Sequence, residues 1–341
     1  MPVVSIILPT KNSIRFMAER VATIKAQRFT DFEVLCLDTD STDGTREFIL
    51  QWAKEDKRVR LIDVPPGLYK ALNFGVRTAQ GKFIYFAMSD DTMYPDALAE
   101  MVAALDRNPD CGICDSRLVE IGENSEVLQD GDEKYTPCFG HLFFDRTKEL
   151  VRRPPFDFYL HCCGRTVYTS LTQILIRKSV FDEIGYFPED RGVSADYYWG
   201  MKASMTTSVI YLPKELATWR LHDTQLTGHD SSFLNFELMK VMAKDVIAMQ
   251  SDLQVKRTAQ RLNKIVGFKT LLLPIKRDGR MFQKVYGLVV AIVRYPGFSA
   301  RFALALLRTW LIEHDPHPKL AAYCLVFRQL LLRCAPEILS I

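Results

Sequence analysis

Short hydrophobic runs alternate with amphipathic segments through the first part of the chain. Four runs are dominated by β-branched, aromatic and other apolar residues, as in buried strands, and they lie at 3–10, 31–37, 59–63 and 83–88. Between them, hydrophobic residues recur at helical spacing over 14–28, 44–56 and 68–79. This strand-helix alternation predicts an α/β fold with a doubly wound, mostly parallel sheet.

Beyond residue 95 the pattern becomes less regular. Further strands or extended pieces are predicted at 111–121, 171–176, 209–212 and 217–222. Further helices are predicted at 95–107 and 179–185, with another that opens near 196. The stretch 122–168 lacks clear periodicity, and an irregular segment of that length is often a lid or a binding loop.

Two of the predicted strands end in acidic residues. The run 83–88 is followed by Asp90 and Asp91, and the run 31–37 leads into a polar turn that opens with Asp38. Carboxylates gathered at the ligand-binding edge of a parallel sheet repel one another unless a cation or a polar ligand compensates them. The pattern therefore indicates a metal-assisted site for a phosphate-bearing substrate. The alternative is that the acids only begin a helix, because Asp suits an N-cap and Pro95 a first turn.

Composition and charge separate two regions. The chain has 341 residues, 48% of them hydrophobic, which permits a substantial core, and a net charge of +3. Residues 254–341 hold 15 Lys and Arg against four acids, whereas residues 1–253 are net acidic. Opposite charge balances in the two regions suggest two different roles.

The cysteines and the N-terminus bear on location. The first residues lack the features of a signal peptide, so a cytoplasmic location with reduced thiols is expected. Cys111 and Cys114, together with the adjacent Cys162 and Cys163, could be assembled into a zinc site, but their spacing favours buried thiols. No apolar stretch reaches the roughly 18 residues needed to span a bilayer.

Four segments, in this order, carry a resemblance to a known family: Val4–Asn12, Asp38–Thr45, Ser89–Asp91, and Ile184–Phe187 followed by Asp196. Together they resemble the inverting nucleotide-sugar glycosyltransferases of family 2, over about residues 2–228. The resemblance implies a GT-A, Rossmann-like catalytic domain at 1–228, with a nucleotide-sugar-binding half at 1–110 and an acceptor half at 111–228. A basic, apolar helical region is expected at 229–341.

The resemblance implies that Pro9, Thr10, Asn12 and Asp38 belong to the pocket for the nucleotide. Relatives usually carry two adjacent acids at the second strand end, whereas in this chain the second acid, Asp40, is displaced by one position. We expect Asp38 to contact the base, with Asp40 as the alternative.

The Ser89–Asp91 segment is similar to the metal-binding triplet of the family, with Ser89 in place of the first acid. The resemblance implies that Asp91 ligates a divalent metal, Mn²⁺ or Mg²⁺, and that Asp90 contacts the ribose or a metal-bound water. Arg220 and His222 resemble an Arg-x-His pair near the diphosphate, where Arg pairs with phosphate and His ligates the metal. The alternative is an exposed loop pair.

Asp196 matches the catalytic base of the family. A carboxylate within reach of the acceptor hydroxyl can take its proton, while a divalent cation neutralises the leaving diphosphate. The alternative role for Asp196 is an N-cap. Lys70 is a further candidate for nucleotide contact. His161 and Gln173 are weaker candidates for the acceptor face, because core or loop roles are favoured for these two residues.

The C-terminal region combines apolar segments with flanking Lys and Arg. A helix is expected over 232–250, followed by apolar runs at 265–273, 285–293, 302–307 and 325–327. Basic helices of this kind lie in membrane interfaces, so residues 254–334 are expected to contact a membrane surface. The alternative is a helical bundle packed on the catalytic domain or on another copy of the chain. Nucleic acid is not expected as a partner.

The sequence therefore predicts a metal-dependent inverting glycosyltransferase that uses a UDP-sugar donor and a glycan or lipid-linked acceptor, in surface polysaccharide synthesis. One alternative is a sugar-phosphate nucleotidyltransferase, which should carry a glycine-rich loop after the first strand, where residues 8–12 contain no glycine. The other is a non-catalytic nucleotide-sugar-binding scaffold. The protein is expected in the cytoplasm, or bound peripherally to the inner face of the membrane.

Overall fold

The computed structural model describes residues 1–130, 147–162, 168–225 and 236–272. The chain divides into two compact units. The first unit comprises 1–135, 148–154 and 168–233, and the second comprises 136–147, 155–167 and 234–341. The second unit thus takes in residues 155–167 in addition to the C-terminal region expected from the sequence.

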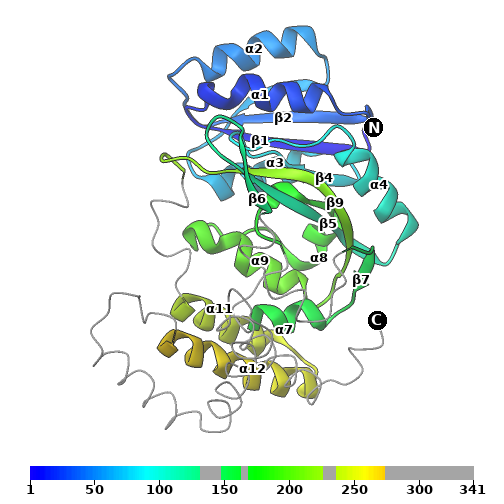
Figure 1. The fold of residues 1–341 in the computed structure, drawn as a ribbon, viewed down its shortest axis with the longest axis vertical. Helices are drawn as coiled ribbons and strands as arrows, with labels where there is room; N and C mark the ends of the chain where they lie inside the picture. The colour runs from blue at the N-terminus through cyan, green and yellow to red at the C-terminus, as the bar shows by residue number, and fades with distance from the viewer. Residues whose placement is uncertain (131–146, 163–167, 226–235, 273–341) are drawn as a thin grey trace. The chain divides into compact units, whose positions relative to one another are not determined.

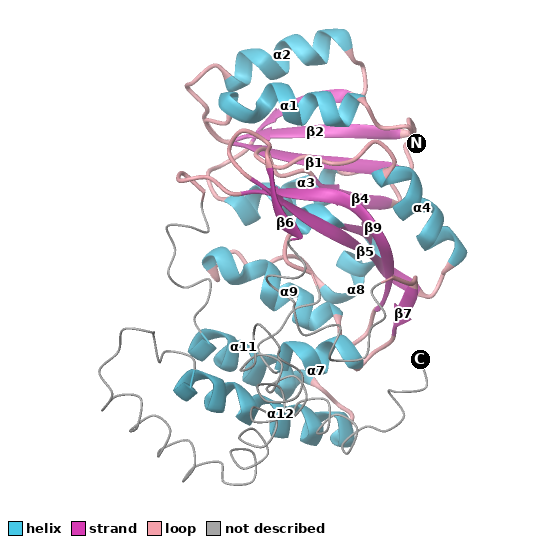
Figure 2. Cartoon of the chain, in the orientation of Figure 1, coloured by secondary structure: helices cyan, strands magenta, loops and turns pink. Residues whose placement is uncertain are grey.

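Helices of the first unit alternate with its strands, as Figures 1 and 2 show. The strands are β1 (Val4–Thr10), β2 (Phe32–Asp38), β3 (Val59–Asp63), β4 (Phe83–Phe86), β5 (Cys111–Ile121), β6 (Val127–Asp130), β7 (Leu150–Arg152), β8 (Ile174–Arg177) and β9 (Ser208–Arg220). The helices are α1 (Ile14–Lys25), α2 (Thr45–Glu55), α3 (Leu68–Thr78), α4 (Ala97–Arg107), α8 (Lys178–Ile184) and α9 (Ala195–Ala203), with 3₁₀ turns η1 (Leu171–Gln173) and η2 (Gly192–Ser194).

The strands within the described residues form one sheet with the order β3-β2-β1-β4-β8-β5-β9-β7, and β6 pairs with β5. Strands β3, β2, β1 and β4 are parallel to one another. Strand β8 runs antiparallel to both β4 and β5, whereas β5 and β9 are parallel. The predicted doubly wound α/β sheet is confirmed, and its second half is mixed.

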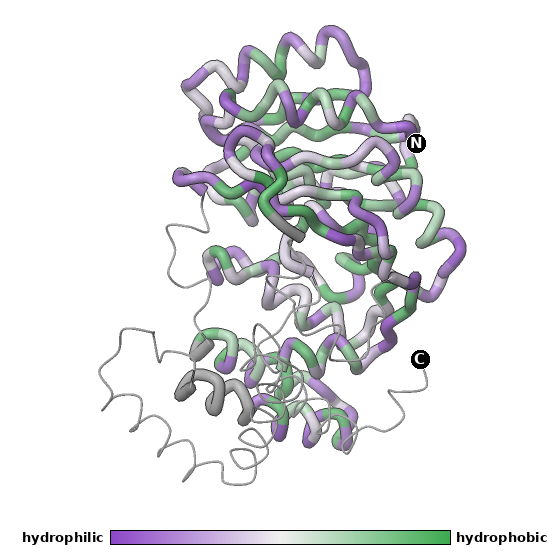
Figure 3. The backbone as a smooth tube through the Cα atoms, viewed as in Figure 1, coloured by the Kyte–Doolittle hydropathy of each residue, from purple (hydrophilic) through white to green (hydrophobic). Residues whose placement is uncertain are grey.

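Both faces of the central strands are covered, because every residue of β1, β2 and β4 is buried. One face packs Val4, Ile6 and Leu8 of β1 into a core that also contains residues of α1, α2 and α4. On the other face, a Cβ placed on Gly75 of α3 would lie 2.7 Å from Ile7 Cγ2, so α3 approaches β1 closely. Figure 3 shows the alternation of hydrophobic and hydrophilic residues along α1 and α2 that this packing requires.

Two predicted strands differ in detail from the structure. The strand predicted over 171–176 begins as η1, because Ser170 and Gln173 form a capping box there, and β8 starts only at Ile174. The extended pieces predicted at 209–212 and 217–222 belong to one strand, β9, whose register against β5 shifts near Ser116 and Arg117. Bulges of this kind absorb extra residues without ending the strand.

The stretch 122–168 is more ordered than its sequence suggested. It contains β6, β7 and a helix of the second unit, α7 (Phe156–Cys162). The intervening residues 131–146 and 163–167, which include Cys163, lie outside the described residues.

The second unit contains α7 together with α11 (Phe236–Met249) and α12 (Leu253–Leu272). Helix α7 contacts both of the others. The helix predicted over 232–250 corresponds to α11, and the apolar runs at 285–293, 302–307 and 325–327 lie outside the described residues. Among the helices of the described residues, none has the length and apolarity to cross a bilayer.

Candidate functional site

The carboxyl ends of β1, β2 and β4 border a pocket of about 580 Å³. In the register of β1 and β2, Thr10 pairs with Asp38, so the two strand ends lie side by side. The pocket is lined by Pro9, Thr10, Lys11, Ser13, Thr39, Gly67, Leu68, Tyr69, Ala71, Met88, Ser89, Asp90, Asp91, Thr169, Ser170, Leu171, Val193, Asp196, Trp219, Thr224 and Gln225. A pocket of this size at a parallel-sheet edge can hold a nucleotide-sized ligand.

Asp38 is buried and its carboxylate is held by the protein. Its Oδ1 accepts hydrogen bonds from Thr10 Oγ1 at 2.9 Å and from Ser41 Oγ at 2.6 Å, and its Oδ2 accepts the Ser41 N–H at 3.1 Å. The neighbouring residue Thr39 lines the pocket. Asp40 is exposed and has a φ of 57°, a conformation that Asp tolerates better than most residues. Neither Asp38 nor Asp40 is among the pocket-lining residues.

Asn12 and Lys70, two other predicted nucleotide contacts, also lie outside the lining. Asn12 joins the turns after β1 and β2, because its Oδ1 accepts the Thr42 N–H at 2.8 Å and its own N–H donates to Ser41 Oγ at 2.9 Å. Lys70 is exposed on α3, whereas Leu68, Tyr69 and Ala71 of that helix and the preceding Gly67 do line the pocket.

Asp91 lies at the base of the pocket and is almost completely buried. Thr172 Oγ1 donates to its Oδ2 at 2.6 Å, and the backbone N–H of Arg220 donates to its Oδ1 at 3.0 Å. Burial, and then the neighbouring charge of Asp90, raises the pKa of Asp91 to about 7, against the lowering effect of these hydrogen bonds. Both oxygens of Asp91 therefore accept hydrogen bonds from groups of the protein itself.

Asp90 and His222 present a pair of donor atoms beside Asp91. Asp90 Oδ2 lies 3.0 Å from His222 Nε2, and His222 Nδ1 lies 2.9 Å from Thr224 Oγ1. The separation of Asp90 Oδ2 and His222 Nε2 is that of a hydrogen bond or ion pair, and His222 is not among the residues that line the pocket. Both side chains are of types that can ligate a divalent cation, and they lie next to each other.

Fewer protein ligands than a dedicated metal cage needs are gathered here. No group of three or more His, Cys, Asp or Glu side chains that could hold a metal is found within the described residues. Ions such as Mg²⁺ are commonly held by one or two carboxylates together with substrate phosphates. The donor set therefore fits a metal that binds with a diphosphate.

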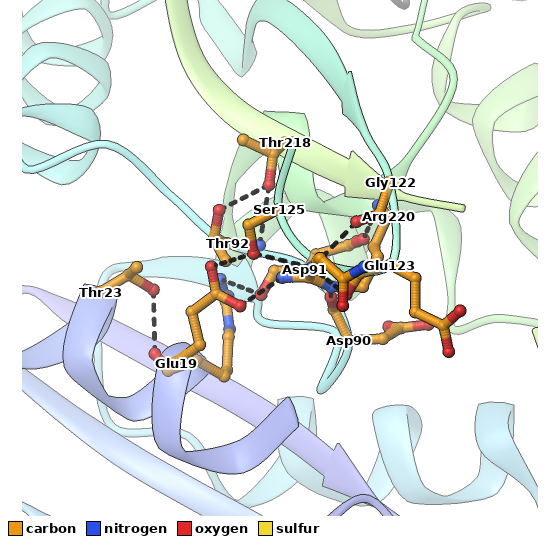
Figure 4. Close-up of polar contacts among 12 residues, drawn as sticks. Glu19, Thr23, Asp90, Asp91, Thr92, Gly122, Glu123, Ser125, Thr218 and Arg220 are labelled. Carbon is orange, nitrogen blue, oxygen red and sulfur yellow. Dashed lines mark hydrogen bonds and ion pairs between the residues drawn. The ribbon is translucent and has the colours of Figure 1, made fainter. Parts of the chain in front are cut away.

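Arg220 borders the same loop but points into the protein. Its side chain is 1% exposed, and its guanidinium donates to Asp90 O at 2.6 Å and to Glu19 Oε2 at 2.6 Å. Figure 4 shows these contacts. Arg220 does not line the pocket, in contrast to the phosphate contact expected from the sequence.

Asp196 lines the pocket from the first turn of α9. Its Oδ1 accepts the Tyr197 N–H at 2.6 Å. Burial raises the pKa of Asp196 to about 6, and hydrogen bonds from the Tyr197 N–H and from the Tyr69 hydroxyl oppose that shift. Burial also raises the pKa of Tyr69 well above its usual value. A carboxylate with a pKa close to neutrality is suited to take a proton.

The Ile184–Phe187 segment positions α9. Gly185 has a φ of 85° and its carbonyl accepts the Trp199 indole N–H at 2.8 Å. The backbone of Phe187 exchanges two hydrogen bonds with the side chain of Asn73, at 2.9 and 3.0 Å, and its ring packs on Trp199. These contacts join α9 to α3, and they place Asp196 beside Tyr69.

The remaining candidates have roles in the interior. Gln173 is buried and its Nε2 donates to Asp115 Oδ1 and to Ser116 O. His161 is buried in α7 of the second unit. Cys111, Cys114 and Cys162 are buried free thiols.

Several residues of the site escaped sequence reasoning. Tyr69, Thr172 and Glu19 contact the predicted acids or their neighbours, yet each is separated from its partner by at least 81 residues of chain. No short motif marks them, because a Tyr on a helix or a Thr before a strand is ordinary in any α/β protein. The sequence pattern did identify the strand-end residues Thr10, Asp90 and Asp91, and the resemblance identified Asp196.

Comparison with known proteins agrees with this geometry. The model for glycosyl transferase family 2 matches residues 5–185. The chain is 25% identical over 230 residues to an uncharacterized glycosyltransferase of Rickettsia typhi, a match that covers 67% of this chain and 66% of that relative, just under two thirds of its length. It is 31% identical over 103 residues to TuaG of Bacillus subtilis, a putative teichuronic acid biosynthesis glycosyltransferase, covering 30% of this chain and 41% of TuaG.

Solved structures share the fold. S. aureus TarS 1–349, in complex with UDP-GlcNAc, has a TM-score of 0.60 at 18% identity, over 96% of this chain and 90% of that one. The mannosyltransferase PcManGT from Pyrobaculum calidifontis, in complex with GDP-Man and Mn²⁺, has a TM-score of 0.60 at 16% identity, over 96% and 86% of the two chains. At these identities the likeness establishes the fold.

The family model extends over more than half of the chain, from β1 through α8, and includes both acidic strand ends. The motifs at the ends of β1, β2 and β4 lie within this match, whereas Asp196 lies beyond it. This chain belongs to glycosyl transferase family 2.

Proposed function

We propose that this chain is a metal-dependent, inverting glycosyltransferase that moves a sugar from a UDP-sugar to a hydroxyl group of an acceptor. One observation carries the proposal. Pro9 and Thr10 from β1, the acids Asp90 and Asp91 after β4, and Asp196 on α9 all line the same pocket. A diphosphate leaving group and a base for the attacking hydroxyl can thus be served from one cavity.

The choice of UDP follows TarS, which was solved with UDP-GlcNAc. PcManGT was solved with GDP-Man and Mn²⁺, so GDP-mannose is the donor to compare. The base would lie at the edge formed by β1 and β2, where Pro9, Thr10 and Thr39 line the pocket. Asp38 would act on the base indirectly, because its carboxylate orders Thr10 and Ser41.

Asp90 and His222 would hold the divalent cation. When bound, the cation would neutralise charge on the departing nucleoside diphosphate. Asp91, which the sequence pointed to as the direct ligand, would order the loop instead, because its oxygens accept hydrogen bonds from Thr172 and Arg220.

Asp196 would remove the proton from the acceptor hydroxyl as that oxygen attacks the anomeric carbon from the face opposite the diphosphate. Direct displacement of this kind inverts the configuration. General base catalysis contributes about 10²–10⁴ in rate. Tyr69 would orient the carboxylate through its hydroxyl.

The acceptor would be a growing glycan or a lipid-linked glycan in surface polysaccharide synthesis, a role supported by the similarity to TuaG, a putative teichuronic acid biosynthesis glycosyltransferase. The C-terminal region would hold the enzyme on the inner face of the membrane through residues 254–334. The other arrangement for this region is an association between two copies of the chain. Exposed Arg257 and Arg261 on α12 support the membrane arrangement, because one helical turn separates them.

The test is a panel of UDP-sugars, with GDP-mannose for comparison, assayed with and without Mn²⁺ for nucleotide release and for thermal stabilisation. We expect Mn²⁺-dependent stabilisation and release with a UDP-sugar. The Asp196→Asn variant should retain the stabilisation and lose at least about 100-fold in transfer rate. The anomeric configuration of the product, read by NMR, should be inverted.

Other outcomes would contradict the proposal in different ways. Stabilisation by GDP-mannose alone would contradict the UDP assignment. Binding of UDP-sugars without release, in the presence of a range of acceptors, would favour the scaffold. Formation of a nucleotide-sugar from a sugar phosphate and UTP would favour the nucleotidyltransferase.

A further inference from the structure

The guanidinium of Arg220 binds three separate segments of the chain at once. It is fully enclosed, and each of its nitrogen atoms donates to an acceptor in the protein. The acceptors are Asp90 O at 2.6 Å, Gly122 O and Glu123 O at 3.1 Å each, Ser125 Oγ at 2.9 Å and Glu19 Oε2 at 2.6 Å. With its planar fork satisfied in this way, Arg220 is held in a single orientation.

Glu19 on α1 is the counter-ion of this cluster, and Figure 4 shows both of its oxygens in use. Oε2 accepts from Arg220, and Oε1 accepts from Ser125 Oγ at 2.6 Å. Ser125 has a φ of 67° in the turn between β5 and β6, so the turn is held in a conformation uncommon for serine. An ion pair between Arg15 and Glu123 joins α1 to the same turn.

The other side of Arg220 reaches the acids of the pocket. Its Nε donates to the carbonyl of Asp90, and its backbone N–H donates to Asp91 Oδ1 at 3.0 Å. The following residue is fixed as well, because the Thr92 N–H donates to Thr218 Oγ1 at 3.0 Å. The acid-bearing loop after β4 is therefore attached to the end of β9 from Asp90 to Thr92.

We propose that Glu19 is a positioning residue, which acts through Arg220 to fix the backbone of the Asp90–Asp91 loop and so the direction in which Asp90 faces the pocket. This proposal rests on the proposed function for its consequence in catalysis. Glu19 itself does not line the pocket. In this pair the guanidinium is buried and the Glu19 side chain is 42% exposed. Without Glu19, the buried cation would lose its only carboxylate partner among the contacts described.

The first test needs no ligand. Hydrogen exchange of the backbone amides in residues 87–93 is measured in the metal-free protein for wild type, Glu19→Ala and Glu19→Gln. Glu19→Ala should raise exchange in this segment about tenfold, and Glu19→Gln, which keeps an acceptor oxygen, should give an intermediate value. Glu55→Gln is the matched control, because Glu55 of α2 pairs at the surface with Lys25 of α1, the helix that carries Glu19. Wild-type exchange in Glu19→Ala would overturn the proposal.

The second test separates positioning from direct phosphate contact. The affinities for UDP and for uridine are measured by calorimetry, with and without Mn²⁺, for Glu19→Ala, Arg220→Lys and the double variant. Positioning predicts that both single variants weaken Mn²⁺-dependent UDP binding about tenfold, the loss expected from one charge-assisted hydrogen bond. Binding of uridine and metal-free binding of UDP should be unchanged, and the double variant should be no weaker than Arg220→Lys.

A direct contact of Arg220 with the diphosphate predicts a different pattern and would overturn the proposal. Arg220→Lys would then weaken UDP relative to uridine even without metal, and Glu19→Ala would leave UDP binding unchanged or strengthen it. Absence of UDP binding by the wild type would contradict the proposed function, whereas the exchange experiment would still decide the role of Glu19. Thermal melts of each variant confirm that it is folded.

Discussion

Asp196 illustrates how position changes the chemistry of a carboxylate. Burial raises its pKa to about 6, whereas the hydrogen bonds from the Tyr197 N–H and the Tyr69 hydroxyl hold it from rising further. Asp91 also has a raised pKa, but both of its oxygens bind internal donors. A side chain that lines the pocket and titrates near neutrality can exchange a proton with an acceptor, and one enclosed by hydrogen bonds can hold a loop in place.

The first prediction concerns the pH dependence of transfer. Asp196 acts as a base only when it is deprotonated, so log kcat/KM, which reports the pKa of the free enzyme, should rise with a slope near one as pH increases up to about 6 and should level off above it. The measurement is nucleotide release with donor and acceptor below saturation from pH 5 to pH 8. A rate that does not vary over pH 5–7 would argue against Asp196 as the base.

The second prediction concerns stability at the same residue. The pKa of Asp196 is higher in the folded protein, about 6, than its usual 3.8, so the folded state is disfavoured once the group ionises. The cost is absent below pH 3.8 and fully present above pH 6. Asp196→Asn, which cannot ionise, should therefore raise the free energy of unfolding at pH 8 by ~1–3 kcal/mol.

Thermal melts from pH 5 to pH 8 measure this effect. The advantage of Asp196→Asn over wild type should narrow as pH falls through 6. Asp190→Asn, at an exposed position a few residues earlier, serves as the control and should leave the melting temperature unchanged at every pH. An advantage that is constant across the range would show that the gain does not come from ionisation.

At the scale of elements, side-chain hydrogen bonds connect the amino ends of the central strands as well as their carboxyl ends. Ser5 of β1 accepts the Gly81 N–H at 2.8 Å and donates to Glu33 Oε1 of β2 at 2.6 Å. Glu33 Oε1 also accepts the Gln80 N–H at 2.7 Å. Gly81 therefore enters β4 against the backbone of β1, where no side chain fits.

The third prediction follows from that contact. A Cβ on Gly81 would lie 2.6 Å from Ser5 N, and the buried backbone of β1 cannot move away. Gly81→Ala should lower the free energy of unfolding by ~2–3 kcal/mol through overpacking. Urea denaturation measures the change. Gln80→Ala, at the exposed neighbouring position, should change it by less than ~0.5 kcal/mol; an equal loss in both variants would mean that the contact with Ser5 is not the cause.

At the scale of the whole molecule, the two units differ in charge and in composition. The acidic pocket belongs to the first unit, while the basic residues of 254–341 belong to the second. Helix α7 lies with α11 and α12 in the second unit, so removal of residues after 233 would expose its buried Phe156, Phe158 and Leu160. Point substitutions are therefore a cleaner test of membrane contact than truncation.

The fourth prediction is made for Arg257 and Arg261. Replacement of both by Gln should weaken binding to vesicles that contain phosphatidylglycerol by on the order of tenfold, because each basic residue near an anionic surface contributes to the attraction. Co-sedimentation at two salt concentrations measures the effect. Lys54→Gln with Lys57→Gln, exposed in the first unit, is the control. Failure of the wild type to sediment with vesicles would rule out membrane contact, and a dimer in analytical ultracentrifugation would support association between copies.

Much of the fold could be predicted because its signals are local. The apolar runs that became β1, β2 and β4 are buried on both faces, and burial of that kind leaves continuous hydrophobic stretches in the sequence. The strand start at 171 differs from the structure for a local reason. Leu171–Gln173 directly precedes the apolar residues Ile174–Ile176 and is therefore included in the predicted strand, but a capping box between Ser170 and Gln173 makes it a 3₁₀ turn.

The candidate site could be predicted only in part. The order of the strand ends, and the acids that follow β2 and β4, are written in consecutive residues, so the sequence could identify the pocket edge, Asp90, Asp91 and Asp196. The role of each acid depends on which hydrogen-bond donors from distant parts of the sequence contact its carboxylate. Thr172 and Arg220 engage Asp91 from 81 and 129 residues away, and His222 meets Asp90 from 132 residues away. Those contacts form only when strands distant in the sequence come together in the folded sheet. In the fold, the guanidinium of Arg220 contacts Glu19 and the acidic loop, and Arg220 does not line the pocket.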